Sequence, residues 1–405
     1  MNADPAVYAG PTALLSAEGQ ELLARIAAAG EKPGGLALGA RLRREYPAAL
    51  VAAAQAQHEL RLAARAKFGR AMEMLFTRDG LEQASSEMIA RHRARRFGGA
   101  GRTADLCCGI GGDLTALAAG REVLAVDRYE VHARLAVHNA GVYGAGAWVR
   151  ACVADVRDVR LGGLDAVFAD PARRTAGNRE TGNRETGPRE TGPRRFRAGL
   201  TEPPMDWCLA LTGQAPAVGI KAAPGLPLNI VPAGWEAEFI ADGRDLKEAM
   251  LWSPALATAA RRATILPAGD TLVPEPGPDV PVGAPGEYLL DPNPAVTRAG
   301  LVAELARRLG ARQIDPMIAF LATDRETRTP FARTLRVLES APWNEKHFAR
   351  RLRELGIGAA DLRRRGLAGD VDRIRRRLKL AGPNRATVVL TRVSGKPWGL
   401  ICTDP

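Results

Sequence analysis

The chain has 405 residues, of which 46% are hydrophobic and 25% are charged, a composition typical of globular proteins with two or three domains. Its 57 Lys and Arg residues exceed its 45 Asp and Glu residues, and the formal net charge of +12 favours a polyanionic partner. No apolar run approaches about 18 residues and no secretory signal is visible, so we expect neither a membrane span nor export.

The cysteines are too few and too scattered for a disulfide framework. None of them forms a C-x-x-C pair, the spacing typical of zinc sites, so we expect no bound metal. This usage predicts a cytoplasmic protein with reduced thiols. The five are Cys107, Cys108, Cys152, Cys208 and Cys402.

The first part of the chain shows the periodicity of helices. Apolar positions recur at helical spacing over residues 14–29, 48–68 and 81–97, with many Ala residues and few β-branched runs. We therefore predict a helical N-terminal domain over residues 1–98.

From residue 102 onward, short apolar runs alternate with helical stretches at 114–119 and 130–139. Each run has the composition of a strand and ends in a turn or an acidic residue. Such alternation favours an α/β fold with a doubly wound, mostly parallel sheet, which we place over residues 99–270. The runs are TADLCC, REVLAVD, WVRACVAD, LDAVFADP and PAVGIKAAP.

Two segments of unusual composition follow. The repeat NRETG NRETG PRETG PRRF has no hydrophobic residue until Phe196, and it predicts a disordered insertion over residues 173–199. The Pro- and Gly-rich stretch 267–285 predicts a linker. Beyond it we expect a smaller α/β domain over 286–405, with helices at 296–309, 331–338 and 371–380 and a strand in TVVLTRV.

The strongest local motif is DLCCGIGGD, from Asp105 to Asp113, where a predicted strand leads into a glycine-rich turn and a helix. Gly109, Gly111 and Gly112 lack a Cβ atom, so the backbone can turn sharply or approach a ligand closely there. The amides at the start of the next helix would face that ligand. The motif alone is compatible with a dinucleotide, with another nucleoside cofactor, or with a tight turn that binds nothing.

Acidic residues follow the next three predicted strands. Asp127 lies 22 residues beyond Asp105, where a carboxylate can accept both hydroxyls of a ribose. Asp155 follows the third strand and could accept from an adenine amine, and Asp170 follows the fourth. Because open α/β sheets bind ligands at the carboxyl ends of their strands, the four acids together predict a binding site at one sheet edge.

These motifs resemble those of the class I S-adenosylmethionine-dependent methyltransferases, whose fold is a Rossmann-like doubly wound sheet. Cys107 stands where the family's GxGxG turn has its first glycine. The resemblance implies S-adenosylmethionine as cofactor, with Asp127 on its ribose and Asp155 on its adenine. The cofactor-binding residues that it implies are Asp105, Cys107, Gly109, Gly111, Gly112, Asp127, Arg128 and Asp155.

The fourth strand ends in Asp170-Pro171-Ala172-Arg173, which resembles the Asp-Pro-Pro-Tyr-like loop beside the acceptor in that family. The resemblance implies that Asp170, with Pro171 and Arg173, forms the catalytic loop. Arg173 replaces the family's aromatic residue and could stack on a base or bind a phosphate. Lys221, at the end of the fifth strand, could act at the same site or form an ordinary ion pair.

Other reactive side chains indicate packing more than catalysis. We expect Cys107 and Cys108 to pack in the tight turn and His132 and His138 to be surface or packing residues. A dehydrogenase is the main competing interpretation of the cofactor motif, because an acid about 20 residues past the glycines also suits a nicotinamide dinucleotide. The CxGxGG turn and the Asp-Pro pair favour a methyltransferase.

The last 120 residues resemble the THUMP-like domain that follows methyltransferases in bacteria, through DPNPAVTRAGL, TPFAR, LRRRG and VVLTRVSGKPWG. This resemblance implies RNA binding, and a solvated helix face is the alternative for the basic residues. Over 371–380 we expect Ile374 and Leu378 to face inward and arginines to track phosphates. The RNA-binding residues we predict are Arg364, Arg373, Arg376 and Arg377.

The basic excess is unevenly distributed. Residues 172–199 hold 8 basic and 3 acidic residues, residues 344–405 hold 15 and 6, and the rest of the chain holds 34 and 36. We therefore expect a methyltransferase that modifies a base of tRNA or rRNA. A methyltransferase of a small molecule or protein, and a non-catalytic RNA-binding protein with a relic cofactor fold, are the alternatives.

Overall fold

A computed structural model describes residues 10–30, 36–173, 201–367, 371–378 and 380–405. The chain forms two compact units, one of Met1–Glu236 with Ala249–Thr258 and one of Ala237–Glu248 with Ala259–Pro405. The insertion predicted over 173–199 lies outside the described residues, Arg173 apart. The domain boundaries 1–98, 99–270 and 286–405 remain our proposal.

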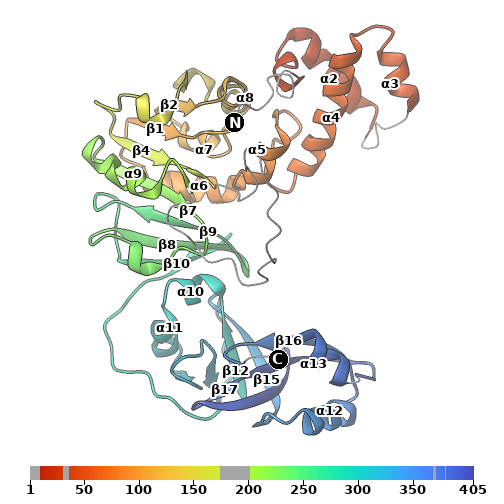
Figure 1. Cartoon of the computed structure of the whole chain (residues 1–405), viewed down its shortest axis with the longest axis vertical. Coiled ribbons are helices and arrows are strands. Elements are labelled where there is room, and N and C mark those ends of the chain that lie inside the picture. Colours follow the sequence, from red (N-terminus) through yellow and green to blue (C-terminus); the bar gives the residue numbers. More distant parts are fainter. Residues whose placement is uncertain (1–9, 31–35, 174–200, 368–370, 379) are drawn as a thin grey trace, which may run out of the picture. The chain divides into compact units, whose positions relative to one another are not determined.

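The N-terminal part is helical, as the periodicity predicts (Figure 1). The stretch 81–97, predicted as one helix, is instead broken after Gln83. The ammonium group of Lys67 donates hydrogen bonds to the main-chain oxygens of Leu81, Glu82 and Ala84, at 2.7, 3.0 and 2.8 Å, and so ends the first of two helices. The helices are α2 (Ala17–Ala28), α3 (Leu36–Leu42), α4 (Ala48–Ala64), α5 (Arg78–Gln83) and α6 (Glu87–Arg96).

A nine-stranded sheet follows, with the strand order β11-β10-β8-β9-β7-β4-β1-β2-β3 (Figure 1). The strands β7, β4, β1, β2 and β3 are parallel, which confirms the predicted Rossmann-like, mostly parallel sheet. The strands are β1 (Arg102–Leu106), β2 (Glu122–Asp127), β3 (Val149–Val153), β4 (Ala166–Ala169), β7 (Ala217–Ala222), β8 (Glu236–Asp242), β9 (Asp245–Trp252), β10 (Arg261–Leu266) and β11 (Asp270–Leu272). The helices among them are α7 (Leu114–Leu117), α8 (Glu130–Val142) and α9 (Met205–Ala210), with 3-10 turns η1 (Gly146–Trp148), η2 (Val156–Asp158), η3 (Leu211–Gly213) and η4 (Leu228–Ile230).

The N-terminal helices and the first strands share a core. One buried cluster joins Phe68 and Phe76 from the helical part to Ile110 in the glycine-rich turn and Leu135 on α8. The helical part therefore packs directly against the elements that carry the predicted cofactor site.

The C-terminal part has a seven-stranded sheet with the order β13-β14-β12-β15-β18-β17-β16, in which β16 and β17 are parallel. Two buried clusters stabilise it, one around Phe320 and Leu335 and one around Phe348 and Leu378. Its strands are β12 (Tyr288–Pro292), β13 (Arg312–Gln313), β14 (Leu321–Thr323), β15 (Ala332–Pro342), β16 (Ile357–Arg364), β17 (Asn384–Val393) and β18 (Lys396–Thr403). Its helices are α10 (Pro294–Arg298), α11 (Val302–Leu309), α12 (Glu345–Glu354) and α13 (Val371–Leu378).

Three predictions of local structure need correction. The helix expected at 331–338 is wrong, because these residues begin β15, which pairs with both β12 and β18. The helix expected at 296–309 is two helices, separated at Gly300, whose φ of +66° lies in the left-handed region. The start of the expected linker 267–285 forms β11, which pairs with β10.

Within the described ranges, no helix is long and apolar enough to cross a membrane.

Candidate active site

Three of the four predicted acidic residues meet at one edge of the parallel sheet. In the register of β1 with its neighbours, Leu106 lies opposite Val126 and Ala169, so Asp105, Asp127 and Asp170 all stand at the carboxyl ends of adjacent strands. Electrostatic interactions reach Asp105 from both of the other acids. The edge is therefore strongly acidic.

Asp105 is the most deeply placed of these acids. Its side chain is fully buried, and neither carboxylate oxygen has a hydrogen-bond partner within the described part of the chain. Burial, reinforced by the nearby charge of Asp170, raises the pKa of Asp105 well above its ordinary value. Asp105 therefore favours the protonated, neutral form.

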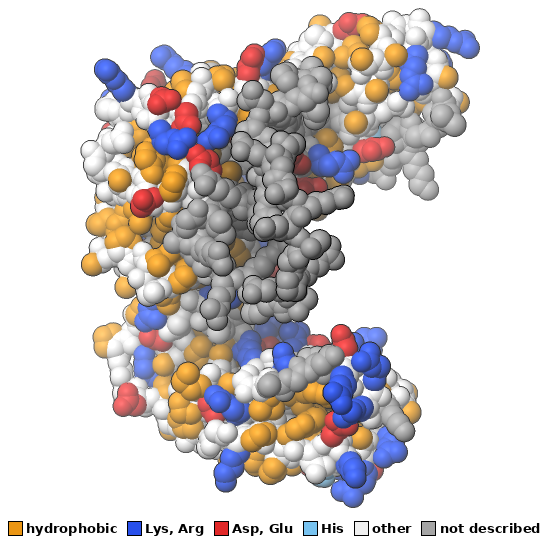
Figure 2. All heavy atoms as spheres, in the orientation of Figure 1, with side chains coloured by type: hydrophobic (Ala, Val, Ile, Leu, Met, Phe, Trp, Pro, Cys, Tyr) orange, Lys and Arg blue, Asp and Glu red, His pale blue; other side chains and the backbone are white. Residues whose placement is uncertain are grey.

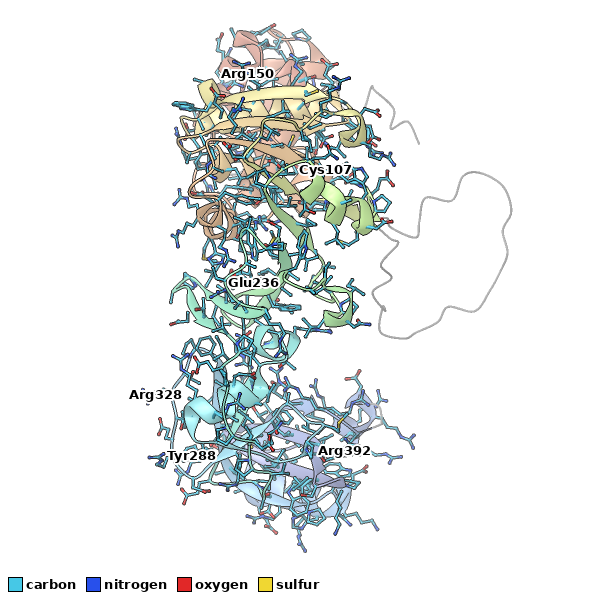
Figure 3. All side chains as sticks on the ribbon, turned by 90° about the vertical axis from the view of Figure 1, so that its left-hand side faces the viewer. Cys107, Arg150, Glu236, Tyr288, Arg328 and Arg392 are labelled. Atoms are coloured by element: carbon cyan, nitrogen blue, oxygen red, sulfur yellow. The ribbon has the colours of Figure 1, made fainter. Side chains whose placement is uncertain are left out.

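The glycine-rich turn after β1 has a left-handed backbone at three positions. Cys107, Gly109 and Gly111 have φ values of +63°, +53° and +78° (Cys107 is labelled in Figure 3). A Cβ atom on Gly111 would lie 2.8 Å from the Cα atom of Ala136 on α8, whereas one on Gly109 would meet nothing within 4 Å. Gly111 thus allows close helix packing, and Gly109 leaves open space at the sheet edge.

Asp127 ties this turn to the start of α8. Its Oδ2 atom accepts a hydrogen bond from the amide of Gly109 at 2.9 Å, and its Oδ1 atom accepts from the amide of Tyr129 at 3.0 Å. The ring of His132 reaches the same carboxylate, with Nδ1 3.3 Å from Oδ1, and packs edge-on against Tyr129. Sequence reasoning missed this role of His132; its position five residues after Asp127, in the first turn of α8, was the available signal.

Asp155 lies apart from the buried acids, in a surface network of charges. Arg157 donates to both of its carboxylate oxygens, at 2.9 and 2.7 Å, and these bonds lower the pKa of Asp155 to about 2. Glu202 lies 3.0 Å from Arg157 and 3.4 Å from Arg128. Asp155 is therefore ionised. Its Oδ1 atom also accepts from the amide of Arg157 at 3.0 Å, so Oδ2 is the oxygen that retains a lone pair for a further donor.

Asp170 forms an ion pair with Lys221, the residue predicted to lie beside it. The ammonium nitrogen is 2.6 Å from Oδ2 of Asp170, which joins the ends of β4 and β7. The Lys221 side chain is 11% exposed and that of Asp170 31%, so the carboxylate faces outward while the ammonium group is mostly covered. Pro171 is buried next to it.

Arg173 is the second residue of β5 (Ala172–Arg173), which pairs with β6 (Thr201–Glu202). The role predicted for its side chain lies outside the described part of the structure.

The cysteines near the edge are poor nucleophiles. Burial raises the pKa of the Cys107 and Cys108 thiols, and it raises the pKa of Cys208 to about 12. Since the thiolate is the reactive form, these side chains act as packing residues, as the sequence indicates. Among the described residues, no group of three or more His, Cys, Asp or Glu side chains is arranged to hold a metal ion.

Two further residues hold the glycine-rich turn and were missed by sequence reasoning. Arg93 on α6 forms a buried ion pair with Asp113, and its guanidinium group lies 5.4 Å from the ring centre of Phe168. Asn139 on α8 donates to the main-chain oxygen of Ile110 at 2.8 Å. Neither belongs to a local motif, since each partner lies 20 or more residues away.

The predicted RNA-binding arginines lie on the C-terminal sheet domain. Arg364 ends β16, and Arg373, Arg376 and Arg377 project from α13 as exposed side chains, with Arg377 3.6 Å from Glu345. Leu378 is fully buried and Ile374 partly buried, as expected. Figure 2 shows Lys and Arg side chains gathered over α12 and α13. The described arginines exposed there are Arg350, Arg353, Arg373, Arg375, Arg376 and Arg377.

Comparison with known proteins identifies relatives of this chain. Two proteins of Mycobacterium tuberculosis, from strains CDC 1551 and H37Rv, are 36% identical to this chain over 336 residues, which cover 79% of the chain and 85% of each relative. Both are named as uncharacterized S-adenosylmethionine-dependent methyltransferases. The chain belongs to this methyltransferase family.

Family models and a solved structure agree with the assignment. The model for RNA cap guanine-N2 methyltransferase matches residues 100–178, that for the THUMP-like domain matches 332–404, and a domain of unknown function matches 9–64. A crystal structure of a Porphyromonas gingivalis W83 protein assigned as a methyltransferase shares the fold. Its TM-score is 0.71 at 20% identity, and the match covers 88% of this chain and 91% of that one.

The methyltransferase uses S-adenosylmethionine, a cofactor that carries an electrophilic methyl group on a positively charged sulfur. The sheet edge fits this molecule. Gly109 leaves open space beside the Asp127 carboxylate, and the buried oxygens of Asp105 lack partners within the described part of the chain. An edge with the carboxylates of Asp127 and Asp170 suits a ligand that combines a cationic centre with hydroxyl and amino donors.

Proposed function

We propose that this methyltransferase methylates a nitrogen of an RNA base, in a tRNA or rRNA. The observation that carries the proposal is the exposed arginine face over α12 and α13 of the THUMP-like domain. Guanidinium groups bind phosphates in bidentate geometry, and a row of them follows a nucleic-acid backbone.

The matched family models support the RNA assignment. The methyltransferase model over 100–178 describes modification of the N2 amine of a guanine in RNA, and the model over 332–404 describes a THUMP-like domain. Both point to the same class of acceptor.

The acceptor end of the site supplies an oriented carboxylate. An amine attached to a base is a weak nucleophile because its lone pair is delocalised into the ring. Asp170 accepts a hydrogen bond from this amine and orients the nitrogen toward the methyl group of the cofactor. Lys221 holds the carboxylate in place through the 2.6 Å ion pair. Methyl transfer then depends mainly on proximity and alignment. Asp127 and the Gly109 turn hold the cofactor, Asp155 contacts its adenine, and Asp170 with Pro171 places the acceptor.

The test is methyl transfer to RNA from a strain that lacks the gene, with labelled S-adenosylmethionine, followed by nucleoside mass spectrometry. We expect one methylated nucleoside to gain label, and D170N to lower kcat by at least about 100-fold. D158N, which removes an exposed acid of η2, is the matched control and should keep full activity. Label in protein or in a small molecule, with none in RNA, would contradict the proposal.

A further inference from the structure

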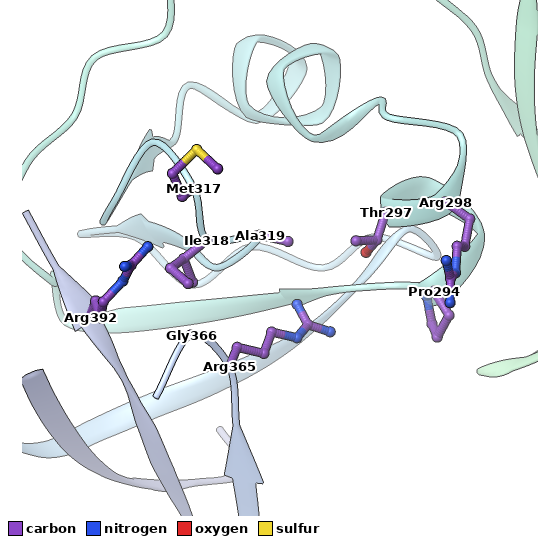
Figure 4. Close-up of a pocket in the computed structure, with 9 residues that line it drawn as sticks. All are labelled: Pro294, Thr297, Arg298, Met317, Ile318, Ala319, Arg365, Gly366 and Arg392. Atoms are coloured by element: carbon purple, nitrogen blue, oxygen red, sulfur yellow. The ribbon is translucent and has the colours of Figure 1, made fainter. Parts of the chain in front are cut away.

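The C-terminal unit contains a pocket that the proposed reaction does not use. It has a volume of about 540 Å³, within the range of small-molecule sites. Of its nine lining residues three are arginines and none is acidic (Figure 4). The lining residues come from α10, the segment before β14, the residues after β16, and β17: Pro294, Thr297, Arg298, Met317, Ile318, Ala319, Arg365, Gly366 and Arg392.

Arg365 is held rigidly at this pocket. Its Nη2 atom lies 2.9 Å from Oδ1 of Asp291, a carboxylate that is 4% exposed, and its guanidinium group stacks 4.6 Å from the ring centre of Phe320. Figure 4 shows the side chain extending toward α10. Within the described ranges its Nη1 atom has no hydrogen-bond partner. That atom is buried, but the Arg365 side chain as a whole is 31% exposed, and a fixed guanidinium group partly open to the pocket suits an anionic ligand.

The two other arginines complete a positively charged wall. Arg392 lies 3.7 Å from the buried carboxylate of Asp315, beyond hydrogen-bond distance, and its Nε atom also lacks a described partner. Arg298 is exposed on α10 and forms no hydrogen bond or ion pair with any residue that the structure describes. Figure 4 shows Arg298 and Arg392 at opposite ends of the pocket with Arg365 between them, and the carboxylates of Asp291 and Asp315 are buried.

The remaining wall is apolar. Ile318 and Ala319 line it, and Met317, a residue that is normally buried, is 81% exposed beside them. A flexible thioether suits contact with a flat aromatic ring. A pocket with arginines on one wall and apolar side chains on the other suits a nucleotide, which carries both a phosphate and a flat ring.

We propose that this pocket binds one nucleotide of the RNA substrate, with its phosphate on Arg298 and Arg365 and its base against Met317 and Ile318. The inference rests on the proposed RNA substrate, but it concerns a contact in the C-terminal unit rather than the methylated nucleotide. It adds to the arginines of α13 a site that holds a base as well as a phosphate.

The experiment is calorimetric titration of the full-length protein, saturated with S-adenosylhomocysteine, with uridine monophosphate and with uridine. We expect the monophosphate to bind and uridine to bind at least about tenfold more weakly, since a charge-assisted hydrogen bond contributes that much. R298Q should weaken monophosphate binding about tenfold without lowering the unfolding temperature. R328Q, which removes an 88% exposed arginine outside the pocket, should change neither.

The same variants are then titrated with bulk tRNA and rRNA. A tenfold loss for R298Q in both titrations supports the proposal. A loss for the monophosphate alone would assign the pocket to a free nucleotide and overturn the RNA contact. No monophosphate binding, or wild-type affinity in R298Q, would overturn the site. RNA methylation with wild-type binding by R298Q refutes only the pocket, whereas Arg298-dependent RNA binding without methylation refutes only the proposed function.

Discussion

At the scale of single residues, Asp127 combines a structural and a proposed binding role in one carboxylate. Its Oδ1 atom accepts from the amide of Tyr129 and contacts His132, while Oδ2, which accepts from the amide of Gly109, retains a lone pair. The same bonds that orient the carboxylate also shape the turn beside it. Cofactor affinity should therefore depend on this side chain both through its direct contact and through the shape of the turn.

We predict that D127A raises the Kd for S-adenosylmethionine at least about tenfold, because hydrogen bonds to a charged group contribute about 1.5–3 kcal/mol each. Isothermal titration calorimetry measures the change, with S-adenosylhomocysteine as a second ligand. D158A serves as the control and should bind like the wild type. Unchanged affinity in a folded D127A protein would remove Asp127 from the cofactor site.

Asp105 gives a prediction for the pH dependence of stability. Its pKa is raised in the folded protein, so above the ordinary Asp pKa of about 3.9 the folded state holds a proton that the unfolded state has lost. Folding then takes up a proton, and stability falls as the pH rises through this window. D105N lacks the titrating group and should lose less stability between about pH 4 and pH 8.

Urea denaturation without cofactor at a series of pH values checks this difference, and D158N should follow the wild type. If the free energy of unfolding changed with pH in the same way for wild type and D105N, the pKa of the buried carboxyl group would not be raised.

At the scale of elements, α8 is joined to the glycine-rich turn and to the N-terminal part by one polar side chain. Asn139 is fully buried; it accepts from the amide of Leu75 and donates to the main-chain oxygens of Leu75 and Ile110. This single amide satisfies three backbone groups that water does not reach. The turn's position therefore depends on a helix that begins more than fifteen residues later.

We predict that N139L destabilises the protein by roughly 3 kcal/mol, because each buried backbone group left unpaired costs about 1–3 kcal/mol. It should also weaken cofactor binding, since Ile110 lies within the turn. Chemical denaturation and calorimetry measure the two effects. N229L, at an exposed position in η4, is the matched control, and equal stability of the two variants would be evidence against the role of Asn139.

The same scale explains which element predictions failed. Residues 331–338 have apolar positions that fit a helix, but β12 and β18 offer pairing on both sides, and the segment becomes a strand. The predicted strands of the parallel sheet were correct because short apolar runs that end in turns and alternate with helical stretches have few other solutions. Pairing between distant strands is absent from any local window.

At the scale of the whole molecule, the basic excess is segregated. Residues 344–405 carry 15 basic and 6 acidic residues, while the chain outside this segment and 172–199 is nearly balanced. A domain with this charge binds polyanions through counterion release, which makes affinity salt-dependent.

We predict that R373Q/R376Q/R377Q reduces the slope of log Kd against log salt for tRNA by roughly 2 to 3, because each phosphate that is no longer neutralised lowers the slope by close to one. Filter binding over a salt series measures the slope. R41Q/R43Q/R44Q removes three exposed arginines of the N-terminal part and should leave it unchanged. Equal slopes in wild type and the α13 variant would show that these arginines are solvated and do not contact RNA phosphates.

The chemistry of the proposed cofactor site was predicted from the amino-acid sequence alone. Asp105, the glycine-rich turn, Asp127 and Asp170 stand in short motifs whose spacing follows from strand and turn geometry, so a linear pattern is enough to find them. Even Cys107 keeps the left-handed backbone of the glycine it replaces.

The residues that support this chemistry emerge only in the folded chain. The partners of Asp113 and Ile110 are Arg93 and Asn139, which lie 20 and 29 residues away along the chain. The arginines of the C-terminal pocket come from α10, β17 and the residue after β16, which are likewise distant in sequence. Such contacts depend on which elements pack together, and packing is a property of the folded core that no local pattern records.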